Sequence, residues 1–106
     1  MDDVKITPEE QTLWSAWINH KNTKSRLEIF MIYADWSRKI ATLLQIRYPH
    51  PLAERGDYIH LASLGLLQAI DRFIPEYNIK FQTFAEPYIK GNILKGLSCY
   101  IKDKNN

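Results

Sequence analysis

Apolar side chains recur every three to four residues in four separate stretches of this chain, which is the spacing of helices with one buried side. The first helix is predicted to begin near Thr7, with Thr7 as its cap, Pro8 in its first turn and Glu10 completing a capping box. A polar connection at residues 21–24 follows it. The apolar positions of this helix are Leu13, Trp14, Trp17 and Ile18.

Two further helices are predicted before residue 74. The second covers residues 25–48 and ends before Pro49 and Pro51, because proline lacks an amide donor and restricts the residue before it. The third covers residues 54–73. The apolar stripe of the second helix consists of Leu27, Phe30, Met31, Ala34, Ile40, Ala41 and Leu44. The core positions of the third are Ile59, Leu66, Leu67, Ile70 and Phe73.

The fourth helix is predicted to run from about Thr83 to about Ile101. Thr83 and Glu86 have the spacing of a capping box, which leaves Pro87 in the first turn, and residues 98–106 read as a short polar tail. No stretch alternates with the period of a strand. The sequence therefore predicts one all-α domain over residues 1–106, a compact bundle of about four helices.

Gly65 lies in the middle of the third predicted helix, where glycine costs about 1 kcal/mol relative to alanine. Close approach of a neighbouring helix is the expected reason. The tryptophans Trp14, Trp17 and Trp36 are expected to fill the interface between the first two helices.

Composition indicates a globular protein of the cytoplasm. The chain has 106 residues, the size of one domain, and 45% of them are hydrophobic, which is ordinary for a packed core. Cys99 is the single cysteine, so the chain forms no internal disulfide and a reducing compartment fits best. The acidic start, Met1-Asp2-Asp3, is unlike a signal peptide, and no apolar run approaches the length of a membrane span.

The candidate reactive residues do not suggest catalysis. Asp57 and His60 lie three positions apart on one helix, a spacing that is common for exposed pairs, and the chain has no Gly-rich phosphate loop or nucleophile motif. We therefore predict no enzyme activity, no metal and no cofactor. The candidate metal ligands do not have the spacing of a metal site; they are His20, His50, His60 and Cys99.

Charge is distributed unevenly along the chain. The net charge is only +2, which alone predicts no nucleic-acid partner. Residues 1–35 carry four basic and six acidic side chains, whereas residues 72–106 carry six basic and three acidic ones. The C-terminal part is therefore the basic part.

The order of residues from Asp57 to Leu97 resembles region two of bacterial sigma factors, the promoter-recognition subunits of RNA polymerase. In primary and flagellar-type members that region reads approximately D-L-I-Q-x-G-x-I-G-L-x-x-A-[IV]-x-[RK]-[FY], then [FY]-x-T-[YF]-A after a short loop. Residues 57–73 follow the first pattern and residues 81–85 the second, at the right distance. Residues 87–91 resemble the P-x-I-[RM]-G continuation of flagellar and sporulation-type members. The resemblance covers residues 13–97 and implies a sigma region two-like fold.

By this resemblance, the helix at residues 57–73 would dock on the coiled coil of the polymerase β′ clamp. An exposed Asp near a helix start can pair with a cation on the partner, and Leu61 could add apolar area. In this patch His60 stands where the family has Gln, and Leu61 stands where Glu or a small residue is common. The implied polymerase-binding residues are Asp57, His60, Leu61 and Ser63.

The resemblance also implies contact with the single-stranded minus-ten promoter element along the fourth helix. Aromatic rings there would stack on unpaired bases and lysines would hold phosphates. Ile79 and Pro87 stand where primary sigma factors have aromatic residues, so promoter specificity does not carry over. The implied stacking residues are Phe81, Phe84 and Tyr88. The implied phosphate contacts are Lys80, Lys90 and Lys95.

The chain ends soon after the resemblance does, so it is expected to lack sigma regions three and four. Three roles remain open. It is either half of a split sigma factor whose second protein supplies region four, a regulator that competes for polymerase without opening DNA, or a sigma fold recruited to bind another protein. The first two predict binding to the β′ clamp, and the third does not.

Overall fold

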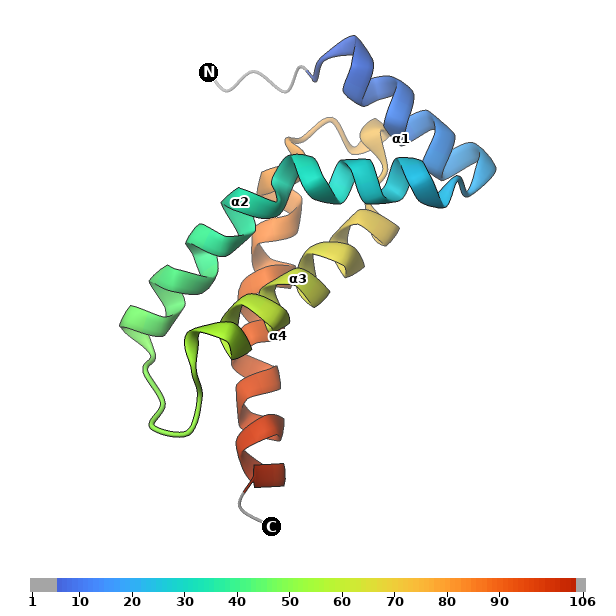
Figure 1. Cartoon of the computed structure of the whole chain (residues 1–106). Helices are drawn as coiled ribbons and strands as arrows, with labels where there is room; N and C mark the ends of the chain where they lie inside the picture. Colours follow the sequence, from blue (N-terminus) through green and yellow to red (C-terminus); the bar gives the residue numbers. More distant parts are fainter. Residues whose placement is uncertain (1–5, 105–106) are drawn as a thin grey trace.

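The computed structural model describes residues 6–104, with side chains up to residue 99, and every element in this range is helical. The all-α prediction is therefore confirmed. Figure 1 shows α1 over the first half of α2, α3 packed against both α2 and α4, and the end of α4 extending past the other helices. The elements are α1 (Pro8–His20), α2 (Thr23–Arg47), α3 (Arg55–Arg72), the 3-10 helix η1 (Pro75–Tyr77) and α4 (Phe81–Lys104). None of the described helices has the length and apolar character needed to cross a membrane.

The start of α1 follows the prediction in one half of the capping box. The Glu10 N–H donates to Thr7 Oγ1 at 3.0 Å, as a capped helix requires. The Glu10 carboxylate, however, accepts from Trp14 Nε1 at 3.0 Å and from the Tyr33 hydroxyl at 2.5 Å. Its role is thus to join α1 to α2 inside the protein, because burying a carboxylate is tolerable only when its oxygens are hydrogen-bonded.

The predicted start and end of the fourth helix are wrong. α4 begins at Phe81, and the predicted capping pair Thr83 and Glu86 lies within it, with Glu86 paired to Lys90 Nζ at 2.6 Å. Burial of the Phe81 ring places the first turn two residues earlier than the capping pattern suggests. Pro87 therefore lies inside the helix rather than in its first turn. The helix also continues to Lys104, beyond the predicted end near Ile101, and residues 105–106 of the predicted polar tail lie outside the described residues.

The apolar stripe predicted for α2 is partly wrong, because some of its residues lie on the exposed side of the helix. Leu27 and Met31 are exposed, whereas the buried side of α2 carries Ile29 and Ser37. The other predicted positions agree better, since Phe30 is half-buried against the core and Ile40, Ala41 and Leu44 are buried. The first half of α2 is rotated in this way because it must present Tyr33 to Glu10 on α1.

Trp14 is the centre of the core and not only a contact between the first two helices. It is almost fully buried, and its ring centroid lies 5.0 Å from that of Phe73 and 5.2 Å from that of Phe81. Trp17 agrees with the prediction, because Arg26 of α2 lies over the Trp17 ring of α1 at 5.3 Å. Trp36 packs partly against the core and meets Tyr33 of its own helix edge-on. Aromatic packing around Trp14 therefore joins α1 to α4 and to the end of α3.

Gly65 lies where the backbones of α3 and α4 come closest. A Cβ placed on Gly65 would be 2.8 Å from Ile89 Cα and 2.8 Å from the Tyr88 carbonyl oxygen. Both atoms belong to the backbone of α4, so no side-chain rotation could make room. The predicted reason for this glycine is confirmed. In the same contact, Asn92 Nδ2 donates to the Leu61 carbonyl oxygen at 2.7 Å.

Replacing Gly65 by alanine should destabilise the protein by about 1–3 kcal/mol, because the added methyl group forces α4 away from α3. Gly91→Ala is the matched control, since a Cβ there meets nothing within 4 Å, and it should stabilise α4 by about 0.5–1 kcal/mol. Urea unfolding followed by circular dichroism would measure both. A Gly65→Ala protein as stable as the wild type would contradict this account of the helix pair.

The Tyr33 hydroxyl should make stability depend on pH in the alkaline range. Burial, reinforced by its hydrogen bond to Glu10, raises the pKa of Tyr33 above its ordinary value. Because the pKa is higher in the folded than in the unfolded protein, the Tyr33 hydroxyl contributes fully to the free energy of unfolding below about pH 10, where the unfolded tyrosine titrates. This contribution is lost as pH rises further. Tyr33→Phe should cost about 1–2 kcal/mol at neutral pH. Unfolding of both proteins from pH 8 upward should show this difference narrowing above about pH 10; a constant difference would contradict the raised pKa.

Candidate functional site

The outer face of α3 carries only some of the predicted docking residues. His60 is exposed and Ser63 is half-buried, as a contact surface allows. Asp57 is half-buried and has a local task, because its Oδ2 accepts the Glu54 N–H at 2.8 Å and so caps the start of α3. Removing Asp57 would therefore weaken the helix as well as any surface contact.

The prediction that Leu61 is an exposed apolar contact is wrong. Leu61 is half-buried and faces α4, where a Cβ on Gly96 would lie 2.3 Å from Leu61 Cδ2. Leu61 lies one turn after Asp57 on α3, and at this point of the helix that side faces α4 rather than solvent. Leu61 therefore contributes to the packing of α3 on α4.

Leu64 is the exposed apolar residue of this face, and it was not among the docking residues predicted from the sequence. Its exposed fraction is 45%, and it lies one turn after His60. The signal was present in the spacing, since positions 60, 64 and 71 fall on one side of a helix opposite Ala62, Leu66 and Ala69. At the end of this face Asp71 forms a two-bond ion pair with Arg26 of α2 at 2.7 and 2.9 Å, and these bonds raise the pKa of Arg26.

A second surface lies on α4 and is built from aromatic rings in series. Phe84 and Tyr88 are four residues apart on one side of α4, and their ring centroids are separated by 5.1 Å. Tyr77 of η1 continues the series, 5.7 Å from Phe84 and tilted by 37°. Lys95 lies seven residues after Tyr88 on the same side of the helix. We call Tyr77, Phe84, Tyr88 and Lys95 the aromatic face.

Arg72 adds a cation to this face from α3. Its guanidinium carbon lies 5.8 Å from the centroid of the Tyr88 ring, which is within the range of a cation–π contact. Arg72 was not among the site residues predicted from the sequence, although the sigma pattern has [RK] at this position. Next to it, a shallow hollow of about 330 Å³ opens between α3 and α4. The hollow is lined by Gln68, Pro87, Tyr88, Gly91, Asn92 and Lys95.

Phe81, Lys80 and Lys90 do not join the aromatic face as predicted. Phe81 is only 3% exposed and packs against Trp14, so it cannot stack on a base without unfolding the core. Lys90 is paired with Glu86 and lies two residues from Tyr88, on the other side of α4. Lys80 is half-buried just before α4 begins.

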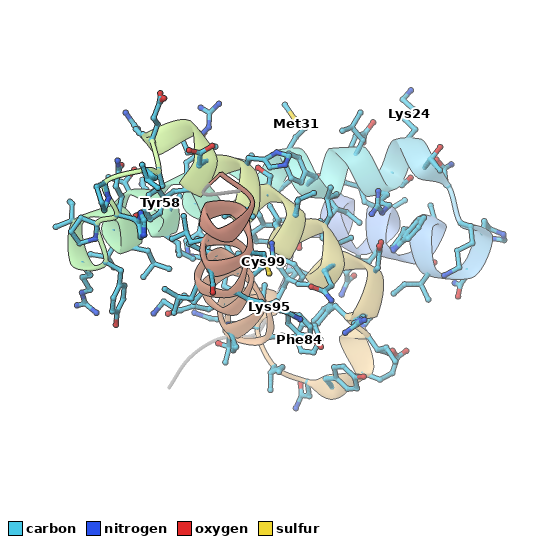
Figure 2. All side chains as sticks on the ribbon, turned by 90° about the horizontal axis from the view of Figure 1, so that it is seen from below. Lys24, Met31, Tyr58, Phe84, Lys95 and Cys99 are labelled. Carbon is cyan, nitrogen blue, oxygen red and sulfur yellow. The ribbon has the colours of Figure 1, made fainter. Side chains whose placement is uncertain are left out.

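The aromatic face lies away from the exposed side of α2. In Figure 2, Met31 and Lys24 of α2 project on one side and Phe84 on the opposite side, with Lys95 on the Phe84 half of the view. The helices thus offer one mixed polar and apolar surface and one aromatic and basic surface. Among residues 6–104, no three His, Cys, Asp or Glu side chains gather closely enough to hold a metal ion.

Known proteins similar to this chain are sigma factors. The chain is 29% identical to the RNA polymerase sigma-D factor of Bacillus subtilis (strain 168), over 84% of the chain and 35% of that protein. It is 36% identical to the sigma-G factor of the same organism, over 48% of the chain and 20% of that protein. It is also 46% identical to the sigma-F factor of Kitasatospora aureofaciens, over 35% of the chain and 12% of that protein.

The predicted resemblance to a sigma factor region is confirmed by these similarities. The chain spans about a third of the sigma-D factor and less of the other two proteins. No family model matches the chain. No solved structure matches it either.

Proposed function

We propose that this chain is a sigma-factor-like transcription protein that binds core RNA polymerase through the outer face of α3 and single-stranded DNA through the aromatic face. The similarity to sigma factors supports the general role. The observation that carries the finer proposal is the presence of two chemically different surfaces, joined through α3 and α4. A protein with both surfaces can hold polymerase and a DNA strand at the same time.

The polymerase contact would be made by the coiled coil of the β′ clamp. His60 and Leu64 offer an exposed polar and apolar pair one turn apart on α3. A leucine that loses its hydration at the centre of a contact contributes more than the charged residues around it. Asp57 and Ser63 would lie at the edge of this contact. Such a partner would place the protein in the cytoplasm.

The DNA contact would be weak and sensitive to salt. Three ring faces in series suit unpaired bases, because stacking accepts any base and contributes about 1–3 kcal/mol for each one. Arg72 and Lys95 supply positive charge beside the rings. Few phosphates can be neutralised by so small a basic surface, so binding should fall steeply as salt increases. In this role the chain would act as the region-two part of a split sigma factor, with a second protein supplying region four.

A regulator that competes for polymerase without holding DNA is the second candidate. It is favoured by two features of α4, the burial of Phe81 and the pairing of Lys90 with Glu86. Both remove groups that the resemblance assigns to the DNA strand. The two roles differ only in whether the aromatic face binds DNA, and the experiments below separate them.

Leu64→Ala should weaken binding to a β′ clamp coiled-coil fragment by about fivefold to tenfold, because it removes the apolar centre of the contact. Leu94→Ala is the matched control, since Leu94 on α4 is 43% exposed against 45% for Leu64. Titration calorimetry with the purified proteins would measure both. Equal affinity for the two variants would sink the α3 docking face, and no binding by the wild type would sink the polymerase proposal.

Tyr88→Ala should lower affinity for a single-stranded oligonucleotide by about 1–3 kcal/mol through loss of stacking. Lys95→Ala should weaken binding and reduce the salt dependence by about one phosphate contact, whereas Lys90→Ala should leave both unchanged. Fluorescence anisotropy over a series of salt concentrations gives these values. If the protein binds the clamp fragment but no oligonucleotide, the competitor role stands and the DNA-binding role fails.

A further inference from the structure

A stripe of six residues runs along one side of α2, and apart from Trp36, which packs partly against the core, it takes no part in the core or in either proposed surface. The residues are four, four, three, four and four positions apart, so they occupy an arc of about 100° on one side of the helix. Ile32 and Leu43 are 48% and 40% exposed, and Trp36 is half-buried. We call this set the α2 stripe. It consists of Glu28, Ile32, Trp36, Lys39, Leu43 and Arg47.

The rest of the protein leaves the α2 stripe uncovered. α1 contacts the first half of α2 through Tyr33 and Arg26, and α3 covers the side that carries Ala41 and Leu44. In Figure 1 the second half of α2 runs on beyond α1. Within the described part of the chain, the charged residues of the stripe have no ion-pair partner. Two apolar side chains and three charges are thus available to another molecule.

The α2 stripe is self-complementary: a second copy of it running in the opposite direction would match each residue with one of suitable chemistry. A two-fold axis crossing α2 between Ser37 and Arg38 would bring each residue opposite the one equally far on the other side. Trp36 would then face Lys39 of the second copy, which suits a cation–π contact. The pairs further out are Ile32 with Leu43, both apolar, and Glu28 with Arg47, which have opposite charges.

We propose that the α2 stripe is the interface of a homodimer in which two copies of α2 pack nearly antiparallel. A two-fold interface is formed by one patch on both copies, so each complementary pair occurs twice. The reversed order matches at all three positions on each side of the axis, and charge complementarity of this kind selects a partner and its orientation. The proposal does not rest on the proposed function.

The dimer contact is made by α2 alone, whereas the aromatic face is built on α4 and η1. One pair of helices buries less than the ~1,200 Å² at the lower end of stable interfaces, so a dissociation constant in the micromolar range is expected.

Sedimentation equilibrium of the whole chain from about 1 µM to about 1 mM should show monomer and dimer in exchange, weakening as salt increases. Glu28→Arg turns two attractive contacts into two repulsive ones and should weaken the dimer at least about tenfold. Arg47→Glu should do the same. The double variant Glu28→Arg, Arg47→Glu exchanges the charges and should restore the wild-type dimer to within about threefold.

Leu27→Arg is the control, because it adds a positive charge to an exposed position about 150° from the middle of the α2 stripe and should not change dimerisation. Circular dichroism of every variant would separate loss of the dimer from loss of the fold. A monomer at all concentrations would overturn the proposal and leave the stripe to a different protein. A dimer that tolerates both single variants, or that the double variant does not restore, would also overturn it.

Discussion

The close contact of α3 and α4 at Gly65 fixes the positions of the other functional groups. Because the glycine has no side chain, the backbone of α4 at Tyr88 and Ile89 rests directly on α3. One and two turns further along α3, Gln68 and Arg72 respectively come beside Tyr88. A larger residue would separate the helices and with them the cation and the ring. The aromatic face therefore depends on a residue that takes no part in it.

A second constraint comes from the aromatic core around Trp14. Trp14 is held at its nitrogen by Glu10 and on its ring by Phe73 and Phe81. This arrangement joins the first helix to the segment in which α3 ends and α4 begins. Phe81 is buried in this core, whereas Phe84, three residues later, is half-buried with its ring centroid 5.3 Å from that of Phe73. The core rings therefore hold Phe84, and through it the rest of the aromatic face, in a fixed order.

Much of this fold could be predicted from the sequence, because the strongest signals are local. Proline at positions 49 and 51 ends α2 where it must, Thr7 caps α1, and Gly65 marks the helix contact. The start of α4 could not be predicted in this way. A capping pattern at Thr83 is a local signal, and burial of Phe81 among side chains from distant parts of the chain outweighed it.

The site was harder to predict because it depends on helical phase. Leu61 and Leu64 are both leucines in the same motif, yet one packs on Gly96 and the other faces solvent. Lys90 and Lys95 differ in the same way, since only the second shares a side with Tyr88. The side of α4 on which each lysine lies is set by how Phe81, Ile89 and Ile93 are buried. That burial follows from tertiary packing rather than from the motif.

α3 is one continuous helix, and this constrains how the sequence of such a protein can evolve. His60 and Leu64 point outward, and Arg72 reaches the ring on α4, all from one helix of 18 residues. Substitutions at the outer positions leave the inner contacts intact, so partner preference can drift one residue at a time. Insertion or deletion of one residue between Leu64 and Arg72 would turn the two sets by about 100° relative to each other. The outer positions of this helix are therefore free to diverge, while its length is not.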